Sequence, residues 1–244
     1  MRWAGEPQYG APTMETKIFS WLGSEFVKIV GEANPGASVE GATAELFQKF
    51  ANTLIPLGLS LDNTVRIRVF GRDRQARTDA TAVRSKIFSG DRRAASSSFI
   101  SQLWFDSAAS AGLELLAMRP SIPTAERKPV DFEPARNYLC YLRYDSVIFY
   151  SGFTSSAETL EQQVDEVLMA IASARAVSGA LTQDFRKTGR LSVLLRRGQQ
   201  LGVVNTVIAK HTWVDLANVE FIFVDGFAGE KFLVEIEATA LIKP

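Results

Sequence analysis

The sequence contains few of the residues that build disulfides and histidine-based sites, because its 244 residues include one cysteine and one histidine. A lone cysteine, Cys140, excludes an internal disulfide, and with a polar, proline-containing start it indicates a reducing cytoplasmic environment. With His211 alone, metal sites and nucleophile relays that need histidine are hard to build, so we expect no metal. We interpret Cys140 as a buried, inert thiol and His211 as a local hydrogen-bonding residue at a helix end.

Net charge and long apolar runs are also missing. Basic and acidic residues balance at 27 each, which leaves no net field for nucleic acid or an anionic membrane. No apolar run approaches the roughly 18 residues that a spanning helix needs. The apolar fraction of 46% is that of a folded globular protein. We therefore expect a cytoplasmic protein that acts on a small molecule, with neither nucleic acid nor a membrane as partner.

A proline-rich segment divides the chain near its middle. Residues 119–136 are polar and hold four prolines, which neither continue a helix nor fit a central strand. We predict an N-terminal extension at 1–16, a first domain at 17–119, a linker at 120–136 and a second domain at 137–244. The four prolines are Pro120, Pro123, Pro129 and Pro134.

Both halves follow the same order of strands and helices. Apolar residues at spacings of three and four predict two helices in each half, and alternating residues predict the strands around them. Ser155 and Glu158 form a capping-box pattern that predicts the start of the first helix in the second half. The order predicts an α/β (more narrowly α+β) fold, in which each half is a mixed sheet with two helices packed on one face.

Two residue pairs indicate that the halves are copies of one unit. Gly31 corresponds to Gly152, and Glu114 corresponds to Glu237, at offsets that differ by only two residues. A duplication explains this match, although two generic α/β units would give a similar pattern.

The closing strand of the second half carries two carboxylates on one face. In LVEIEATALI, Glu235, Glu237 and Thr239 alternate with apolar residues, which places the two carboxylates roughly 6–7 Å apart. Such a pair suits proton transfer or water activation if burial raises one pKa. The spacing alone favours a solvated strand face, or ion pairs with Arg190 and Arg196, over such a catalytic pair.

Several segments resemble the RidA (reactive intermediate deaminase) family. VEIEATAL is similar to that family's C-terminal signature, and Tyr138 to Gly152 is similar to its opening hairpin, where a tyrosine precedes a Ser-Gly pair. In the first half, LSLDNTVRIRVF is similar to the family's helix-to-strand passage, and GLELLAM is similar to a weaker closing strand. The resemblance covers nearly the whole chain outside the extension and the linker.

The resemblance implies two chorismate-mutase-like domains and assembly into a homotrimer with ligand pockets between neighbouring domains. Many family members hydrolyse reactive enamines or imines, such as 2-aminoacrylate, to a keto acid and ammonia without metal or organic cofactor. An arginine binds the substrate carboxylate bidentately, a glutamate positions or activates water, and a tyrosine and a serine line the pocket. By position, these residues correspond to Glu235 as the catalytic group and to Tyr138, Ser151 and Gly152 as substrate-binding residues.

The family's arginine is missing from both halves. Its position holds Asn218 or Val219 in the second half and Ala95 in the first. We therefore predict that Asn218 is a binding residue. We also predict that Arg93, which lies just before Ala95, substitutes for the missing arginine. Further options are Arg92, Arg66, Arg68 and Arg143. The first half also has Lys17, Val30 and Gly112 where the family has tyrosine, serine and glutamate, so we interpret it as a structural wall.

The leading functional hypothesis is a diverged RidA-like hydrolase or deaminase that acts on a small enamine, imine or related carboxylated metabolite. Glu235 would activate water, and Tyr138 and Ser151 would hydrogen-bond in the pocket. A non-catalytic protein that binds small ligands or serves in assembly is the alternative, which the missing arginine favours. A third hypothesis is a hydrolase like the chorismatases, which also carry RidA-like domains, although this chain is short for one.

Overall fold

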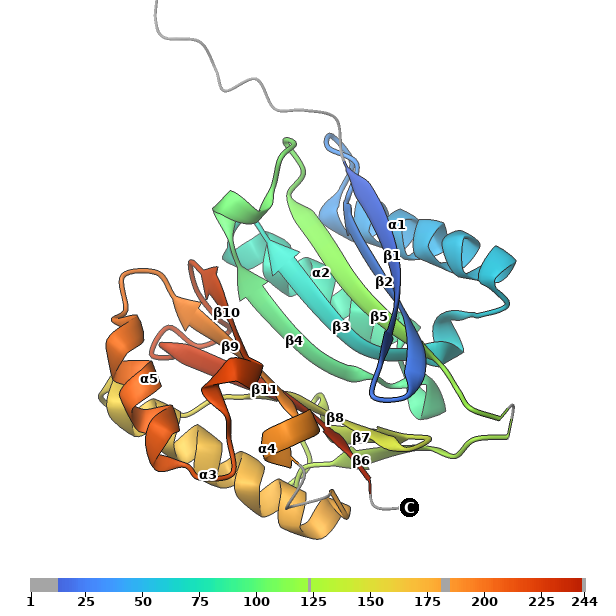
Figure 1. Cartoon of the computed structure of the whole chain (residues 1–244). Coiled ribbons are helices and arrows are strands. Elements are labelled where there is room, and N and C mark those ends of the chain that lie inside the picture. The colour runs from blue at the N-terminus through green and yellow to red at the C-terminus, as the bar shows by residue number, and fades with distance from the viewer. Residues whose placement is uncertain (1–12, 123, 181–184, 243–244) are drawn as a thin grey trace, which may run out of the picture.

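The structure of the protein is a computed structural model that describes residues 13–122, 124–180 and 185–242. Pro123 and the first twelve residues of the expected extension lie outside the described residues. The chain forms two β-sheets whose inner faces pack against each other, and helices cover the outer face of each sheet (Figure 1). This arrangement confirms the predicted α+β class with two helices packed on each sheet.

The first sheet has the strand order β1-β2-β5-β3-β4 and is covered by α1 and α2. The side chain of Ser38 caps α1 by accepting a hydrogen bond from the backbone of Gly41, and Asp73 caps α2 in the same way. The apolar face of α1 then packs into the core under the sheet. The elements are β1 (Met14–Trp21), β2 (Ser24–Glu32), α1 (Val39–Leu54), β3 (Thr64–Gly71), α2 (Arg74–Ile87), β4 (Ala95–Ile100) and β5 (Ala111–Arg119).

The second sheet repeats this order with one extra strand. Its order is β10-β9-β11-β8-β7-β6, and α3 and α5 pack on its outer face (Figure 1). The elements are β6 (Arg127–Asp131), β7 (Leu139–Tyr144), β8 (Val147–Phe153), α3 (Leu160–Ser178), α4 (Phe185–Thr188), β9 (Arg190–Arg196), α5 (Leu201–Lys210), β10 (Val219–Val224) and β11 (Val234–Leu241).

Three local features differ from the sequence predictions. The first helix of the second half begins at Leu160, and its capping box is Thr159 with Gln162, whereas the Ser155 hydroxyl accepts a hydrogen bond from the Ala157 backbone in a local turn before the helix. The first strand includes residues 14–16, which we had placed in the extension. Residues 127–131, within the predicted linker, form edge strand β6 and pair with β7.

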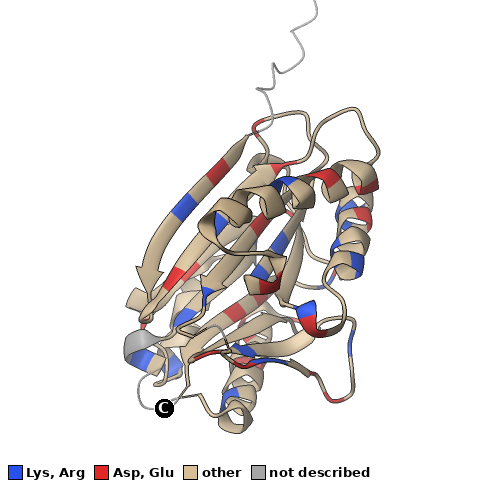
Figure 2. Cartoon of the chain, turned by 90° about the vertical axis from the view of Figure 1, so that its right-hand side faces the viewer, with Lys and Arg blue, Asp and Glu red and all other residues tan. Residues whose placement is uncertain are grey.

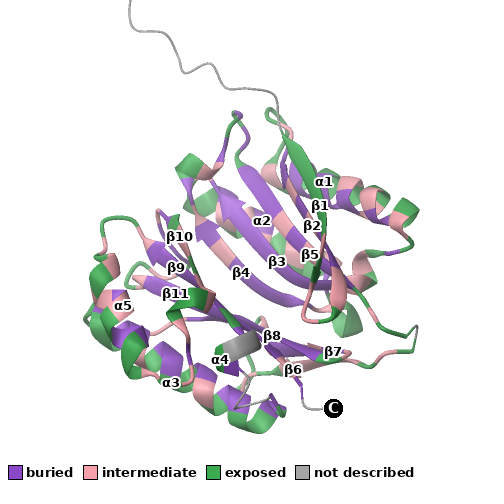
Figure 3. Cartoon of the chain, in the orientation of Figure 1, coloured by how far each residue is buried: buried purple, intermediate pink, exposed green. Residues whose placement is uncertain are grey.

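Two apolar clusters join the inner faces of the sheets. One lies at the end near β7 and β8 and the other near β9 and β10, and each takes side chains from both halves. Figure 3 shows the strands of both sheets largely buried where they face each other. The large buried side chains here are Phe26 and Phe149 in the first cluster, and Phe70, Phe99 and Phe227 in the second. Burying each contributes roughly 1.5–3 kcal/mol, so the two halves are held as one body.

Charges of both signs are interspersed over the helices and strands (Figure 2). No helix in the described part of the chain is long and apolar enough to cross a membrane.

Candidate functional site

The polar face of β11 points toward the first sheet and is buried. Glu237 is fully buried and Glu235 is 8% exposed, while the alternate residues of the strand pack into the core of the second half. The solvated-face interpretation is therefore wrong. Pairing with Arg190 and Arg196 is also wrong, because the cations that reach Glu237 come from β3 of the first half.

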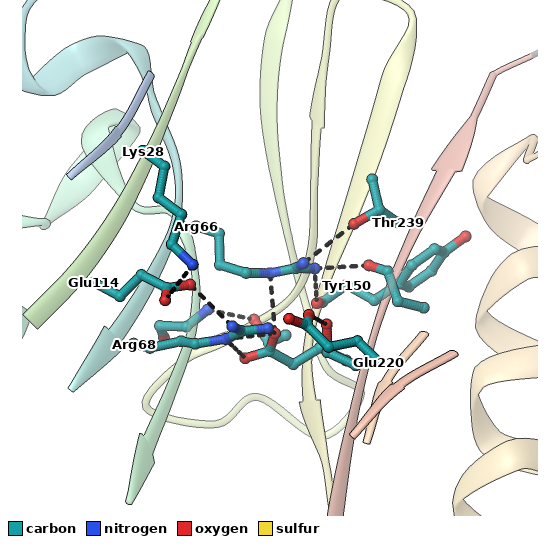
Figure 4. Close-up of polar contacts among 12 residues, drawn as sticks. Lys28, Arg66, Arg68, Glu114, Tyr150, Glu220 and Thr239 are labelled. Carbon is teal, nitrogen blue, oxygen red and sulfur yellow. Dashed lines mark hydrogen bonds and ion pairs between the residues drawn. The ribbon is translucent and has the colours of Figure 1, made fainter. Parts of the chain in front are cut away.

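Two arginines of β3, Arg66 and Arg68, which Figure 4 labels, contact the Glu237 carboxylate between the sheets. Arg68 donates from Nε and Nη2 to Glu237, with Nη2 at 2.7 Å from Oε2, and its Nη1 donates to Glu114 at 2.9 Å. Arg66 lies 3.4 Å from Glu237 through Nε and donates through Nη2 to the carbonyl of Ala238 at 2.7 Å. The network thus joins the two glutamates that the repeat pattern had matched, one from each half.

Glu235 and Glu237 have opposite protonation preferences. Burial alone would raise the pKa of Glu237, but the charges of Arg68 and Arg66 hold it below its usual value. Burial raises the pKa of Glu235 to about 8, and the neighbouring Glu237 carboxylate also raises it, whereas Ser97 and Arg77 oppose the rise. At neutral pH, Glu237 is therefore an anion and Glu235 is mostly a neutral acid. Two carboxyl groups whose pKa values differ in this way are typical of an acid–base site.

Gly152 makes room for the Glu235 side chain. A Cβ at Gly152 would lie 1.7 Å from Oε1 and 2.4 Å from Cδ of Glu235, so any larger residue would displace the carboxyl group. The pairing of β8 with β11 also shifts register between Ile236 and Ala238, opposite this glycine. The glycine of the Ser-Gly pair therefore has a packing role, since it gives space to the acid.

A cavity of about 620 Å³ opens beside Glu235, between the two halves. It is bounded by β4 and α2 of the first half, and by β8, β11, the segment before β7 and the segment before β11 of the second half. Cavities of this size hold small organic ligands. Its lining includes Arg77, Arg84, Ser96, Arg136, Tyr138, Gly152 and Glu235.

Two arginines of α2 supply positive charge to this cavity. Arg77 and Arg84 are seven residues apart, which places them on one face of the helix about 10 Å apart along its axis. Arg77 donates from Nη2 to the Ser98 hydroxyl at 2.6 Å, and Arg84 donates from Nη1 to the Ser96 hydroxyl. Neither forms an ion pair with a carboxylate of the described residues, and the Nε of Arg84 is buried with no hydrogen-bond partner there. Burial and the charge of Arg77 lower the pKa of Arg84 to about 10, so it stays cationic at pH 7.

The predicted site residues divide into two groups. Glu235, Tyr138 and Gly152 line the cavity together. Ser151 does not line it, because its side chain is fully buried and accepts a hydrogen bond from the Ser96 backbone at 3.1 Å, which fastens β8 to β4. Asn218 lies elsewhere, where its side chain donates to the carbonyl of residue 186 and borders a separate hollow near β1.

Arg93 lies beside the site rather than in it. Its guanidinium pairs with Asp131 at 2.6 Å and borders an adjoining cavity of about 400 Å³. Of the other substitute arginines considered, Arg66 and Arg68 belong to the Glu237 network, and Arg92 pairs with Asp62. None of these lines the main cavity, and neither does Arg143.

Three arginines that line the cavity were not predicted from the sequence: Arg77 and Arg84 on α2, and Arg136 in the segment before β7. Arg77 and Arg84 lie beside the buried stripe of Ala76, Ala80 and Val83 on α2 and are themselves half-buried. Their seven-residue spacing was the available signal, but an exposed helix face usually carries such charges. The first half is thus more than a structural wall, because α2 contributes two of the three arginines that line the cavity.

The lone histidine and cysteine lie outside this cavity. His211 caps the C-terminal end of α5, and its Nε2 lies 2.8 Å from Asp165. Cys140 packs against the core, and burial raises the pKa of its thiol to about 11, which makes it a poor nucleophile. Among the described residues, no group of three or more histidine, cysteine and acidic residues could hold a metal ion.

The site combines a proton donor with arginines that form no ion pair with a carboxylate of the described residues. A neutral carboxylic acid next to arginines can bind an anionic ligand and protonate it. Tyr138 and the serines of β4 add hydrogen-bonding groups around the same space.

The comparisons with known proteins address the fold. No protein-family model matches the sequence, and no curated protein matches it. A solved chorismatase structure matches 93% of this chain and 79% of its own, with a TM-score of 0.57 and 15% identity.

Single-domain proteins match about half of the chain. A member of the YjgF/YER057c/UK114 family from Mycobacterium tuberculosis matches 48% of this chain and 100% of its own, with a TM-score of 0.41 and 24% identity. A YjgF-family protein from Neisseria meningitidis matches 49% and 97%, with a TM-score of 0.39 and 21% identity. The sheet order repeated in both halves and the likeness to chorismatase over nearly the whole chain show that this chain is a two-domain protein of the YjgF/RidA fold.

Proposed function

We propose that the protein is a hydrolase that protonates the electron-rich double bond of a small carboxylated enamine or enol ether, with Glu235 as the general acid. The observation that carries the proposal is the buried Glu235 carboxyl group, whose pKa is raised to about 8, at the wall of an arginine-lined cavity. A carboxylic acid with a pKa near the working pH is well matched to proton transfer.

The reaction balances with one glutamate. The Glu235 carboxyl group gives its proton to the terminal carbon of the double bond, and the nitrogen or oxygen lone pair forms an iminium or oxocarbenium ion. The resulting Glu235 carboxylate then removes a proton from water as the water oxygen adds to this cation, which restores the acid. The adduct breaks down to a keto acid and either ammonia or an alcohol.

This order refines the role assigned from the sequence. Water activation needs an ionised carboxylate, whereas Glu235 is mostly protonated at neutral pH. Proton donation therefore comes first, and activation of water follows from the carboxylate that donation leaves behind. Glu237, held as an anion by Arg68, opposes the ionisation of Glu235 and so strengthens its hold on the proton before substrate arrives.

Arg77 and Arg84 are the groups that we propose bind the substrate carboxylate. They stand in for the family's arginine, whose positions hold Ala95 and Asn218. The Arg84 guanidinium lines the cavity and forms no ion pair with a carboxylate of the described residues, so its charge is available to a substrate carboxylate.

The solved chorismatase supports a hydrolase over other reaction classes, since it shares the two-domain architecture. Enamine deamination and enol-ether hydrolysis share the carbon-protonation step, so the site geometry serves both. A non-catalytic ligand-binding protein is the second candidate, which the absence of an arginine at Ala95 and Asn218 favours.

The test is turnover of enamines generated in situ, followed by release of ammonia, alongside hydrolysis of a carboxylated enol ether. Glu235→Gln should lower kcat by roughly 10²–10⁴, the usual contribution of a general acid. Activity of the unsubstituted protein should fall as pH rises above about 8. The matched control is Glu161→Gln, an exposed carboxylate on α3, which should leave kcat unchanged.

Unchanged kcat in Glu235→Gln would contradict the assignment of the acid. If the unsubstituted protein turns over no enamine or enol ether but binds small carboxylates in calorimetry, the non-catalytic alternative holds instead.

A further inference from the structure

A second cavity adjoins the main one and shares part of its wall. It measures about 400 Å³ and lies between the end of α2, the start of β4 and the start of β7. Arg84, Ser96 and Tyr138 border both cavities, so the two spaces meet at the arginine that we assign to the substrate carboxylate.

The chemistry of this second cavity differs from that of the first. Its wall combines four buried apolar residues with uncharged polar ones. The apolar residues are Ile67, Phe88, Ala94 and Leu139, and the polar ones are Ser85, Ser89, Ser96, Asn137 and Tyr138. Its further arginine, Arg93, is already neutralised by Asp131, with Nη1 and Nη2 at 2.6 and 3.3 Å from the two carboxylate oxygens. Asp91 also borders the cavity and repels anions. The second cavity therefore suits an uncharged group whose apolar part lies against Ile67, Phe88 and Leu139, and it opposes a second carboxylate.

The size of the site leads to the same conclusion. Spaces of roughly 300–1,000 Å³ bury drug-sized ligands. A three-carbon imino acid would leave most of the 620 Å³ main cavity, and all of the adjoining one, filled with water.

We propose that the adjoining cavity is a subsite for an apolar tail of the substrate. The preferred substrates are then monocarboxylates with an aliphatic or aromatic side chain, bound by Arg84 at the junction and by the apolar wall beyond it. This inference rests on the proposed function, because it takes the carboxylate to lie beside Glu235.

The experiment measures binding of 2-oxo acids, the products of enamine hydrolysis, by calorimetry on the full chain. The probes are pyruvate, 2-oxobutyrate, 2-oxohexanoate, phenylpyruvate and the dicarboxylate 2-oxoglutarate. We expect affinity to rise along the first four, with phenylpyruvate at least tenfold tighter than pyruvate, and 2-oxoglutarate no tighter than 2-oxobutyrate.

Two alanines provide a matched pair of variants. Ala94 borders only the second cavity and Ala82 borders only the main one. Ala94→Leu should abolish the preference for phenylpyruvate and leave pyruvate binding intact, whereas Ala82→Leu should keep the preference. If Ala94→Leu does not fold, Ser89→Leu at the exposed rim of the second cavity replaces it.

The outcomes separate this inference from the proposed function. Equal affinity for all monocarboxylates, a preference that survives filling of the second cavity, or tighter binding of the dicarboxylate would overturn the tail subsite. In those cases enamine turnover that depends on Glu235 would leave the proposed function standing. Absence of both 2-oxo acid binding and turnover would overturn the two together.

Discussion

Replacing Glu235 by glutamine should change how the stability of the protein depends on pH. Burial raises the pKa of this carboxyl group from its ordinary value of 4.5 to about 8. Because the folded state favours the protonated form, the stabilisation is fully present below pH 4.5 and is lost as pH rises to about 8. The difference between the two pKa values corresponds to about 5 kcal/mol, or about 1.4 kcal/mol for each pH unit.

Glutamine mimics the neutral acid and cannot ionise, so Glu235→Gln should lack this loss. We expect the free energy of unfolding of the variant, relative to the original protein, to rise steadily between pH 5 and pH 8. Glu237 does not affect this comparison. The stability that Glu237 contributes is lost only as pH falls through its lowered pKa, and this loss occurs in both proteins.

The assay is urea unfolding of both proteins at pH 5, 6, 7 and 8, with the midpoint and the slope fitted at each pH. Glu161→Gln on the surface of α3 serves as the control and should follow the original protein. If the difference between Glu235→Gln and the original protein is constant over this range, Glu235 ionises normally and the argument from burial is refuted.

Three further substitutions test individual parts of the structure. Gly152→Ala should lower turnover by roughly 10²–10⁴, because its Cβ displaces the Glu235 carboxyl group; Gly202→Ala, with no atom within 4 Å of its Cβ, should not. Arg68→Met should lower the free energy of unfolding by about 3–5 kcal/mol, since it strips a buried carboxylate of its main partner; a loss below ~1 kcal/mol, measured by urea unfolding, would contradict the network. Thr159→Ala should cost about 1 kcal/mol through loss of the α3 cap, and an unchanged midpoint would place the cap elsewhere.

The architecture was predictable because local patterns determine most of it. Apolar residues at spacings of three and four predicted two helices in each half, and the structure has α1 and α2 in the first half and α3 and α5 in the second. The alternation in VEIEATAL likewise predicted which face of β11 enters the core. The start of α3 was misplaced because Ser155 and Thr159 both precede capping-box patterns, and only the fold decides where the strand before them ends.

The candidate site was predictable only in part, because it is assembled from both halves. The spacing of Glu235 and Glu237 suggested an acid pair, but nothing local indicated that Arg68 would reach one of them and not the other. The arginines of α2 face a cavity only because the second half packs against β4. Contacts between segments more than a hundred residues apart leave no periodic signal in a single sequence.

The most direct test of the central claim is the titration of Glu235 itself, followed by carbon-13 NMR of the labelled glutamate carboxyl groups. The resonance that disappears in Glu235→Gln assigns the group. The structure predicts a midpoint near pH 8 for that resonance. A midpoint near 4.5, the ordinary pKa of a glutamate, would contradict the claim that Glu235 is a neutral acid at the cavity between the two halves.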